Sequence, residues 1–129
     1  MQTMDRSAAA RIEDEHVAAL RSRVVSALGA YHSAIDKMTD RLEFDQRSKG
    51  RVEELLAEAT PMLDIARLMD PAARRQAMDV AEDRVRKARH DLRRTMFLLA
   101  EAEGSSLTEI ARAWQVSRQL VSRMTREIG

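Results

Sequence analysis

The sequence predicts an all-α protein, and three observations support that fold class. Gly and Pro number only 4 and 2 in 129 residues, too few turn formers for a chain of many short strands. Ala, Leu, Arg, Glu and Met are abundant, and all of them favour helices. Apolar residues recur at spacings of three and four over long stretches. We therefore expect a long-helix antiparallel bundle or coiled coil, followed by short helices near the C-terminus.

Residues 7–45 are predicted to form the first long helix. Nine side chains at spacings of four and three should make one stripe along it: Ile12, His16, Leu20, Val24, Leu28, Tyr31, Ile35, Met38 and Leu42. His16 and His32 fall on or beside this stripe, which favours a place in the core or in an interface. A polar segment ending in Gly50 is expected to stop the helix.

Two start signals follow a second helical stretch over residues 51–59. Thr60-Pro61 predicts a short helix over 61–69, with Thr as the N-cap and Pro at the first helical position. Asp70-Pro71 predicts a second long helix reaching about residue 103. Its seam steps by three and four through Met78, Ala81, Val85, Ala88, Leu92, Met96 and Leu99. Such long stripes exceed what one chain can cover, so residues 1–90 are predicted to form a helical dimerisation region.

Composition excludes several classes of protein. The chain has no Cys, which removes disulfides, Cys-ligated zinc and thiol nucleophiles. No uncharged run has the length of a membrane span, and the first fifteen residues carry too many charges for a signal peptide. These features predict a cytoplasmic protein. Residues 1–83 hold 12 basic and 16 acidic side chains, whereas residues 84–129 hold 10 and 5, so a polyanion would meet the C-terminal part.

The most informative pattern lies in residues 104–124. Gly104 is expected to end the preceding helix, and Ser106 with Glu109 forms an S-x-x-E capping box for the next one. Gln115-Val116 should then make a short turn before Ser117 caps a further helix. The expected buried residues are Leu107, Ile110, Ala111 and Trp114 on the first helix, and Leu120, Val121, Met124 and Ile128 on the second.

Two short helices with a tight turn, the second rich in Arg, Ser and Gln, resemble bacterial helix-turn-helix DNA-binding domains of repressors, recombinases and sigma factors. The resemblance covers about residues 104–129. It rests on Thr108-Glu109-Ile110-Ala111, Val116-Ser117 and Val121-Ser122-Arg123. Gln115 departs from the family pattern, which usually has Gly because the turn needs a positive φ; Gln adopts that conformation at a modest cost.

This resemblance implies a wingless three-helix helix-turn-helix domain over residues 91–129, with a recognition helix over 117–128. Arg118 or Arg123 would bond guanine bidentately, and Gln119 would read adenine. A solvated helix face is the alternative for each Arg. The implied DNA-binding residues are Ser106, Thr108, Ser117, Arg118, Gln119, Ser122, Arg123 and Arg126. The basic run from Arg84 to Arg94 either faces solvent or adds phosphate contacts, which would include Arg93 and Arg94.

No pattern in the sequence predicts catalysis. The three histidines lack ligand spacing, and phosphate-binding loops, dinucleotide turns and serine-nucleophile elbows are missing. We therefore predict no enzymatic activity, no cofactor, no metal and no small-molecule substrate. The resemblance implies a sequence-specific double-stranded DNA-binding protein, a homodimeric transcriptional regulator or nucleoid-associated protein. The alternative is a helical adaptor whose helix-turn-helix binds a protein of the transcription or cell-division machinery, which the net charge of only +1 favours.

Overall fold

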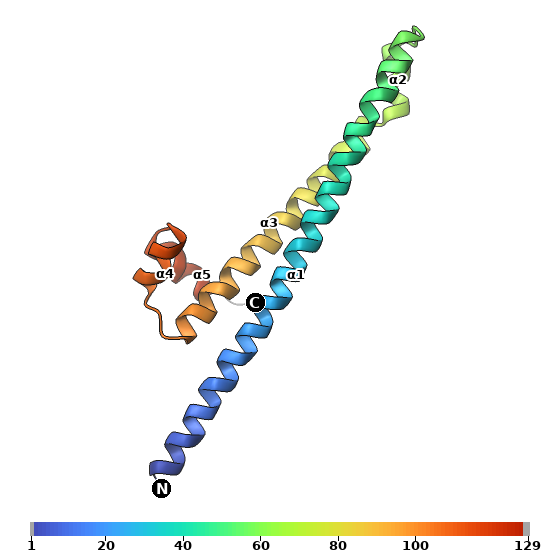
Figure 1. The fold of residues 1–129 in the computed structure, drawn as a ribbon. Coiled ribbons are helices and arrows are strands. Elements are labelled where there is room, and N and C mark those ends of the chain that lie inside the picture. Colours follow the sequence, from blue (N-terminus) through green and yellow to red (C-terminus); the bar gives the residue numbers. More distant parts are fainter. Residues whose placement is uncertain (1, 128–129) are drawn as a thin grey trace. The chain divides into compact units, whose positions relative to one another are not determined.

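The computed structural model describes residues 2–127, with side chains from Ser7 onward, and every regular element in that part of the chain is a helix. The helices are α1 (Gln2–Ala57), α2 (Met62–Met69), α3 (Pro71–Ala102), α4 (Leu107–Trp114) and α5 (Arg118–Thr125) (Figure 1). The all-α prediction is confirmed. The chain divides into two compact units: Tyr31–Ala88 forms one, and the residues up to Ala30 together with those from Arg89 onward form the other.

Helix α1 is longer than the sequence predicted, because it continues through residues 46–50. Gly50 lies inside the helix, where Gly costs about 1 kcal/mol relative to Ala. A helix of this length can carry that cost, since neighbouring turns support it. Lys49 Nζ lies 3.5 Å from Glu53 Oε1, an i,i+4 pair that spans the glycine. The predicted stop at Gly50 is therefore wrong.

The true end of α1 uses an alanine in a left-handed conformation. Ala59 has φ of 60°, and the N–H of Thr60 donates to the carbonyl of Leu55 at 3.0 Å. Pro61, with φ of −58° and ψ of 141°, is the N-cap of α2, and no side chain caps that helix. The short helix is confirmed, but Thr60 does not play the capping role that the sequence predicted. Asp70 does cap α3, since its Oδ1 accepts from the N–H of Ala73 at 3.2 Å.

In the unit Tyr31–Ala88, α3 runs antiparallel to α1 (Figure 1). The inward side chains of both helices follow a heptad rhythm. The inward positions on α1 are Tyr31, Ala34, Met38, Arg41, Asp45, Ser48, Val52 and Leu55. Those on α3 are Arg74, Met78, Ala81, Val85 and Ala88. Leu42, the last residue of the predicted stripe, is exposed, as is His32. The seam uses Ala34 where the predicted stripe passes through Ile35, which lies half-buried beside it.

A charged cluster interrupts this seam. Asp45 Oδ1 lies 3.1 Å from Arg41 Nη2 and 3.5 Å from Arg74 Nη1. Both guanidinium groups also lie over the ring of Phe44, at 4.8 and 5.0 Å from its centroid. Arg74 further donates from Nε to the carbonyl of Met69 at 2.6 Å. These contacts connect α1 with the start of α3 by polar groups, where an apolar pattern would have been expected.

In the other unit, α1 becomes inward-facing only from Val17 onward. Leu20 and Ala27 are buried and Val24 is half-buried, but Ile12 and His16 are exposed. Arg21 forms an ion pair with Glu103, which follows the last residue of α3. The apolar stripe predicted on α1 therefore starts too early. His16 and His32 are exposed, so neither lies in the core of the chain, and their place in an interface stays a prediction. Within the described residues, no helix combines the length and apolarity needed to cross a membrane.

Candidate nucleic-acid interface

The end of α3 packs with α4 and α5 around a small apolar core. Phe97, Ile110, Ala111, Val121 and Met124 are all buried in it. Leu107, Val116 and Leu120 pack against these residues and stay half-buried. Ile110, Ala111, Val121 and Met124 are buried as predicted, whereas Trp114 is exposed. Ile128 lies outside the described residues. Phe97 supplies the wall from α3 that two short helices could not provide.

Helix α4 begins where the sequence predicted. Gly104 has φ of 99°, and the N–H of Ser105 donates to the carbonyl of Ala100 at 3.0 Å. Glu109 N–H donates to Ser106 Oγ at 3.1 Å, and Ser106 N–H donates to Glu109 Oε1 at 2.9 Å, so the capping box is complete. The backbone and side-chain hydrogen bonds from Ser106 lower the pKa of the Glu109 carboxyl, since they favour its ionised form.

A tight turn joins α4 to α5. Gln115 has φ of 55° and ψ of 46°, the left-handed conformation that the family resemblance implies at this position. The N–H of Val116 then donates to the carbonyl of Ala111 at 3.0 Å. Ser117 caps α5, since its Oγ accepts from the N–H of Leu120 at 3.0 Å. Helix α5 ends at Thr125, with Arg126 as its C-cap, and is shorter than the predicted span 117–128.

The candidate DNA-binding residues form two exposed groups. Ser117, Arg118, Gln119 and Arg123 are exposed on α5 or at its start, and Arg126 is exposed at its C-cap. Ser122 is half-buried. Residues 118 and 122, and likewise 119 and 123, lie one turn apart on the same side of the helix. Ser106 and Thr108 are exposed at the start of α4. The first turn of α5 contains no acidic residue.

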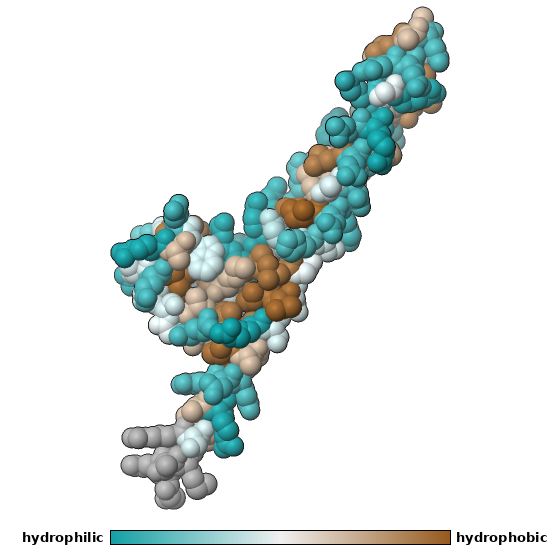
Figure 2. Space-filling model, viewed as in Figure 1, coloured by the Kyte–Doolittle hydropathy of each residue, from teal (hydrophilic) through white to brown (hydrophobic). Residues whose placement is uncertain are grey.

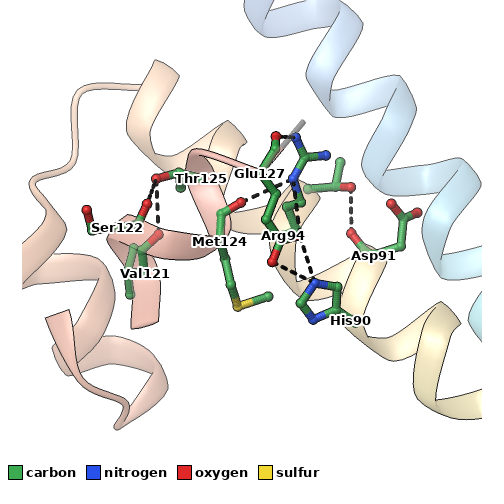
Figure 3. Close-up of polar contacts among 9 residues, drawn as sticks. His90, Asp91, Arg94, Val121, Ser122, Met124, Thr125 and Glu127 are labelled. Atoms are coloured by element: carbon green, nitrogen blue, oxygen red, sulfur yellow. Dashed lines mark hydrogen bonds and ion pairs between the residues drawn. The ribbon is translucent and has the colours of Figure 1, made fainter. Parts of the chain in front are cut away.

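Arg94 does not point into solvent but lies against the protein backbone. Its role as a phosphate contact stays a prediction. Figure 3 shows Arg94 against the end of α5, where Nε donates to the carbonyl of Met124 at 3.1 Å and Nη2 to that of Glu127 at 2.5 Å. Its side chain is only 13% exposed. His90 Nε2 lies 2.8 and 3.0 Å from the carboxylate oxygens of Glu127. Arg93 is half-buried.

This tie between α3 and the end of α5 was missed by the sequence analysis. Arg94 is separated from its carbonyl partners by 30 and 33 residues, and no local pattern connects residues so far apart. The basic neighbours of Arg94 predict only a basic run along α3. In the structure its guanidinium donates to carbonyls that a helix leaves unpaired at its C-terminus, where the helix dipole favours a cation.

Trp114 is less buried than predicted. Its ring meets the ring of Phe97 edge to face, with centroids 5.2 Å apart and an interplanar angle of 90°. The residue nevertheless keeps 39% of its surface exposed. It closes the end of the core at the last residue of α4 and also presents an apolar edge to solvent.

The unit Tyr31–Ala88 contains a groove that the sequence did not predict. Its volume is about 470 Å³, and its apolar lining includes Val52, Met62, Ile65, Ala66 and Met69. The charged residues in its lining pair with one another, Asp45 with Arg74 and Lys49 with Glu53. The groove therefore offers apolar surface rather than a free acid or base.

Comparison with family models, with curated proteins and with solved structures finds no match to this chain. Over the described part of the chain, no three His, Asp or Glu side chains come close enough together to hold a metal ion.

Proposed function

We propose that the chain is a sequence-specific double-stranded DNA-binding protein, a homodimeric regulator of transcription or a nucleoid-associated protein, with α5 as its recognition helix. The observation that carries this proposal is the exposed face of α5. It presents Arg118, Gln119 and Arg123 to solvent, while Val121 and Met124 on its opposite face are buried. The resemblance of residues 104–129 to bacterial helix-turn-helix domains points the same way.

The size of α5 fits the groove that it would enter. An α-helix with its side chains is about 10–12 Å in diameter, and the major groove is about 12 Å wide, so α5 can lie in it. The planar forks of Arg118 and Arg123 match guanine O6 and N7, and the amide of Gln119 matches adenine N6 and N7. Ser117 uses its Oγ lone pair for the helix cap, so its hydroxyl proton is free to donate to a phosphate.

Local charge supports a polyanionic partner. Residues 107–127 contain four arginines and two glutamates. Both glutamates are engaged, Glu109 by the capping box and Glu127 by His90. All four arginines are exposed and outnumber the two carboxylates, so this segment carries a net charge of +2.

The test is a set of alanine variants measured on specific and random duplexes over a range of salt. Arg118→Ala or Arg123→Ala should cost about 1–3 kcal/mol on the specific duplex and relax the preference at one base pair. Arg93→Ala, if Arg93 contacts a phosphate, should weaken binding to all duplexes and reduce the salt slope by about one. Arg51→Ala, on an exposed side of α1, is the matched control and should bind as wild type. Unchanged binding by both α5 variants would refute the assignment.

The second candidate is a protein-binding adaptor, favoured by the exposed edge of Trp114 and by the net charge of +1. A protein interface often uses a partly exposed tryptophan as an anchor. Trp114→Ala should then abolish capture of the partner protein, with circular dichroism checking that the variant keeps its helices. A gel shift on random genomic fragments at low salt separates the two functions directly, because the adaptor would shift none of them.

The proposal of a homodimer needs a different basis from the one that the sequence suggested. Within each unit the inward positions of α1 lie against α3, so the long stripes do not by themselves require a second copy. The dimer instead fits the use of helix-turn-helix proteins on operators with two half-sites about 34 Å apart. The surface that joins the copies must then be found among the exposed apolar residues.

A further inference from the structure

Helix α2 leaves a well-defined apolar and charged face in solvent. Ile65 is fully buried beneath it, whereas Leu63 is 70% and Leu68 is 66% exposed. Between these leucines, the side chains of Asp64 and Arg67 are 52% and 76% exposed. In Figure 2 brown apolar surface appears among the teal at the upper right, where Figure 1 draws α2. Two leucines this exposed on an eight-residue helix form a patch rather than a scattered pair.

The four side chains share one side of the helix. At about 100° per residue, Leu63, Arg67, Asp64 and Leu68 follow one another over an arc of about 140°, and the buried Ile65 comes about 60° beyond Leu68. Along the chain the face begins with Leu63 and Asp64 and, after two other residues, ends with Arg67 and Leu68. In the reverse direction the order is again leucine, charge, charge, leucine, but the acidic and basic residues exchange places. A face with this symmetry is complementary to itself.

We propose that a second copy of this chain docks on this face, with the two α2 helices antiparallel about a two-fold axis. Asp64 then lies opposite Arg67 of the second copy near the centre of the contact, and this contact occurs twice. Leu63 and Leu68 flank these pairs on both sides and cover them with apolar surface. A parallel arrangement would place Asp64 opposite Asp64, and like charges in contact oppose association. The proposal rests on the homodimer in the proposed function, because it locates that second copy, but not on DNA binding.

The patch also indicates how strong the association should be. Met62, at the start of α2, is 59% exposed but lies on the opposite side of the helix, so it does not extend the contact. The face of a two-turn helix is also smaller than the roughly 800 Å² per partner of a standard interface. We therefore expect a reversible dimer that forms in the range of tens to hundreds of micromolar.

Charge exchange tests the proposal with the full-length chain in the absence of DNA. By sedimentation, Asp64→Arg alone and Arg67→Asp alone should each weaken self-association roughly tenfold or more, because each places like charges opposite one another. A mixture of the two variants in equal amounts should associate again, because one face is then wholly basic and the other wholly acidic. Each variant loses the same internal pair between Asp64 and Arg67, so differences in helix stability do not explain the rescue.

Two apolar variants complete the test. Leu63→Gln combined with Leu68→Gln should abolish the dimer, whereas Val80→Gln, at an exposed apolar position on α3, should leave it unchanged. Circular dichroism checks that all variants keep their helices. A monomeric wild type at hundreds of micromolar, a dimer that resists the substitutions in α2, or a mixture that fails to associate would each overturn the proposal. DNA affinity measured at concentrations where the chain is monomeric tests the function of α5 separately.

Discussion

Replacing Arg94 separates a structural role from a DNA-binding one. Arg94→Ala removes two hydrogen bonds from a guanidinium to the carbonyls of Met124 and Glu127. A hydrogen bond to a charged group contributes about 1.5–3 kcal/mol. In the variant, the carbonyls at the end of α5 hydrogen-bond to water instead, which offsets part of the free energy lost with the two hydrogen bonds. We expect the variant to lose about 2–3 kcal/mol of unfolding free energy, including the lost packing of the aliphatic stem.

The chain contains its own probe for this measurement. Trp114 is the single tryptophan, and its ring contacts Phe97 in the core on which α5 packs. Urea unfolding followed by Trp114 fluorescence therefore reports on this unit. With a slope of about 1–3 kcal/mol/M, the loss lowers the midpoint by about 1–2 M. Arg94→Lys should fall between the variant and wild type, because one ammonium group cannot reproduce the fork.

Arg93→Ala is the matched control for Arg94→Ala. It changes the adjacent arginine, for which the described residues show no side-chain hydrogen bond, and its midpoint should stay within about 0.3 M of wild type. The reasoning is refuted if Arg94→Ala also keeps the wild-type midpoint. A reduced salt slope of DNA binding with unchanged stability would return Arg94 to the role of a phosphate contact.

Three further outcomes follow from the same unit. Gln115→Gly should raise its stability by up to about 1 kcal/mol in the urea assay, because Gly adopts φ of 55° without strain. Hydrogen bonds from Ser106 lower the pKa of Glu109 in the folded state, so ionised Glu109 stabilises the unit. This stabilisation is complete above the ordinary pKa of 4.5 and is lost as pH falls through the lowered pKa. Glu109→Gln should therefore remove this acid dependence of the urea midpoint. Val121→Asp should unfold the unit by burying an unpaired carboxylate, whereas Val25→Asp, at an exposed position, should change stability by less than about 0.5 kcal/mol.

The parts of the fold that the sequence predicted well are those decided within a few residues. Asp70 before Pro71, Gly104, and the Ser106 to Glu109 spacing each act on a backbone group at most four positions away. The positive φ of Gln115 was implied by the resemblance to helix-turn-helix domains, which usually have Gly at this position of the turn. Such local signals define the backbone conformation by themselves, and the rest of the fold only has to be compatible with it.

Long-range contacts left no such signal. Arg94 and the carbonyl of Met124 are 30 residues apart, and Arg94 has the same sequence environment as Arg93, which takes a different position. Gly50 does not end α1, because a glycine ends a helix only where the residues after it are more stable outside the helix than in it. Here the helix continues to gain inward contacts beyond it, at Val52 and Leu55.

The seam of α1 shows why the predicted stripe drifted from the real one. The prediction followed large apolar side chains and so chose Leu28, Ile35 and Leu42 at some steps. The structure instead keeps a regular seven-residue spacing. It places the small residues Ala27 and Ala34 inward, where two helices can approach closely. It then continues the same rhythm through Arg41 and Asp45, which pair with each other inside the seam. A heptad seam is fixed by the periodicity of the two helices together, so neither side-chain size nor polarity at a single position reveals it.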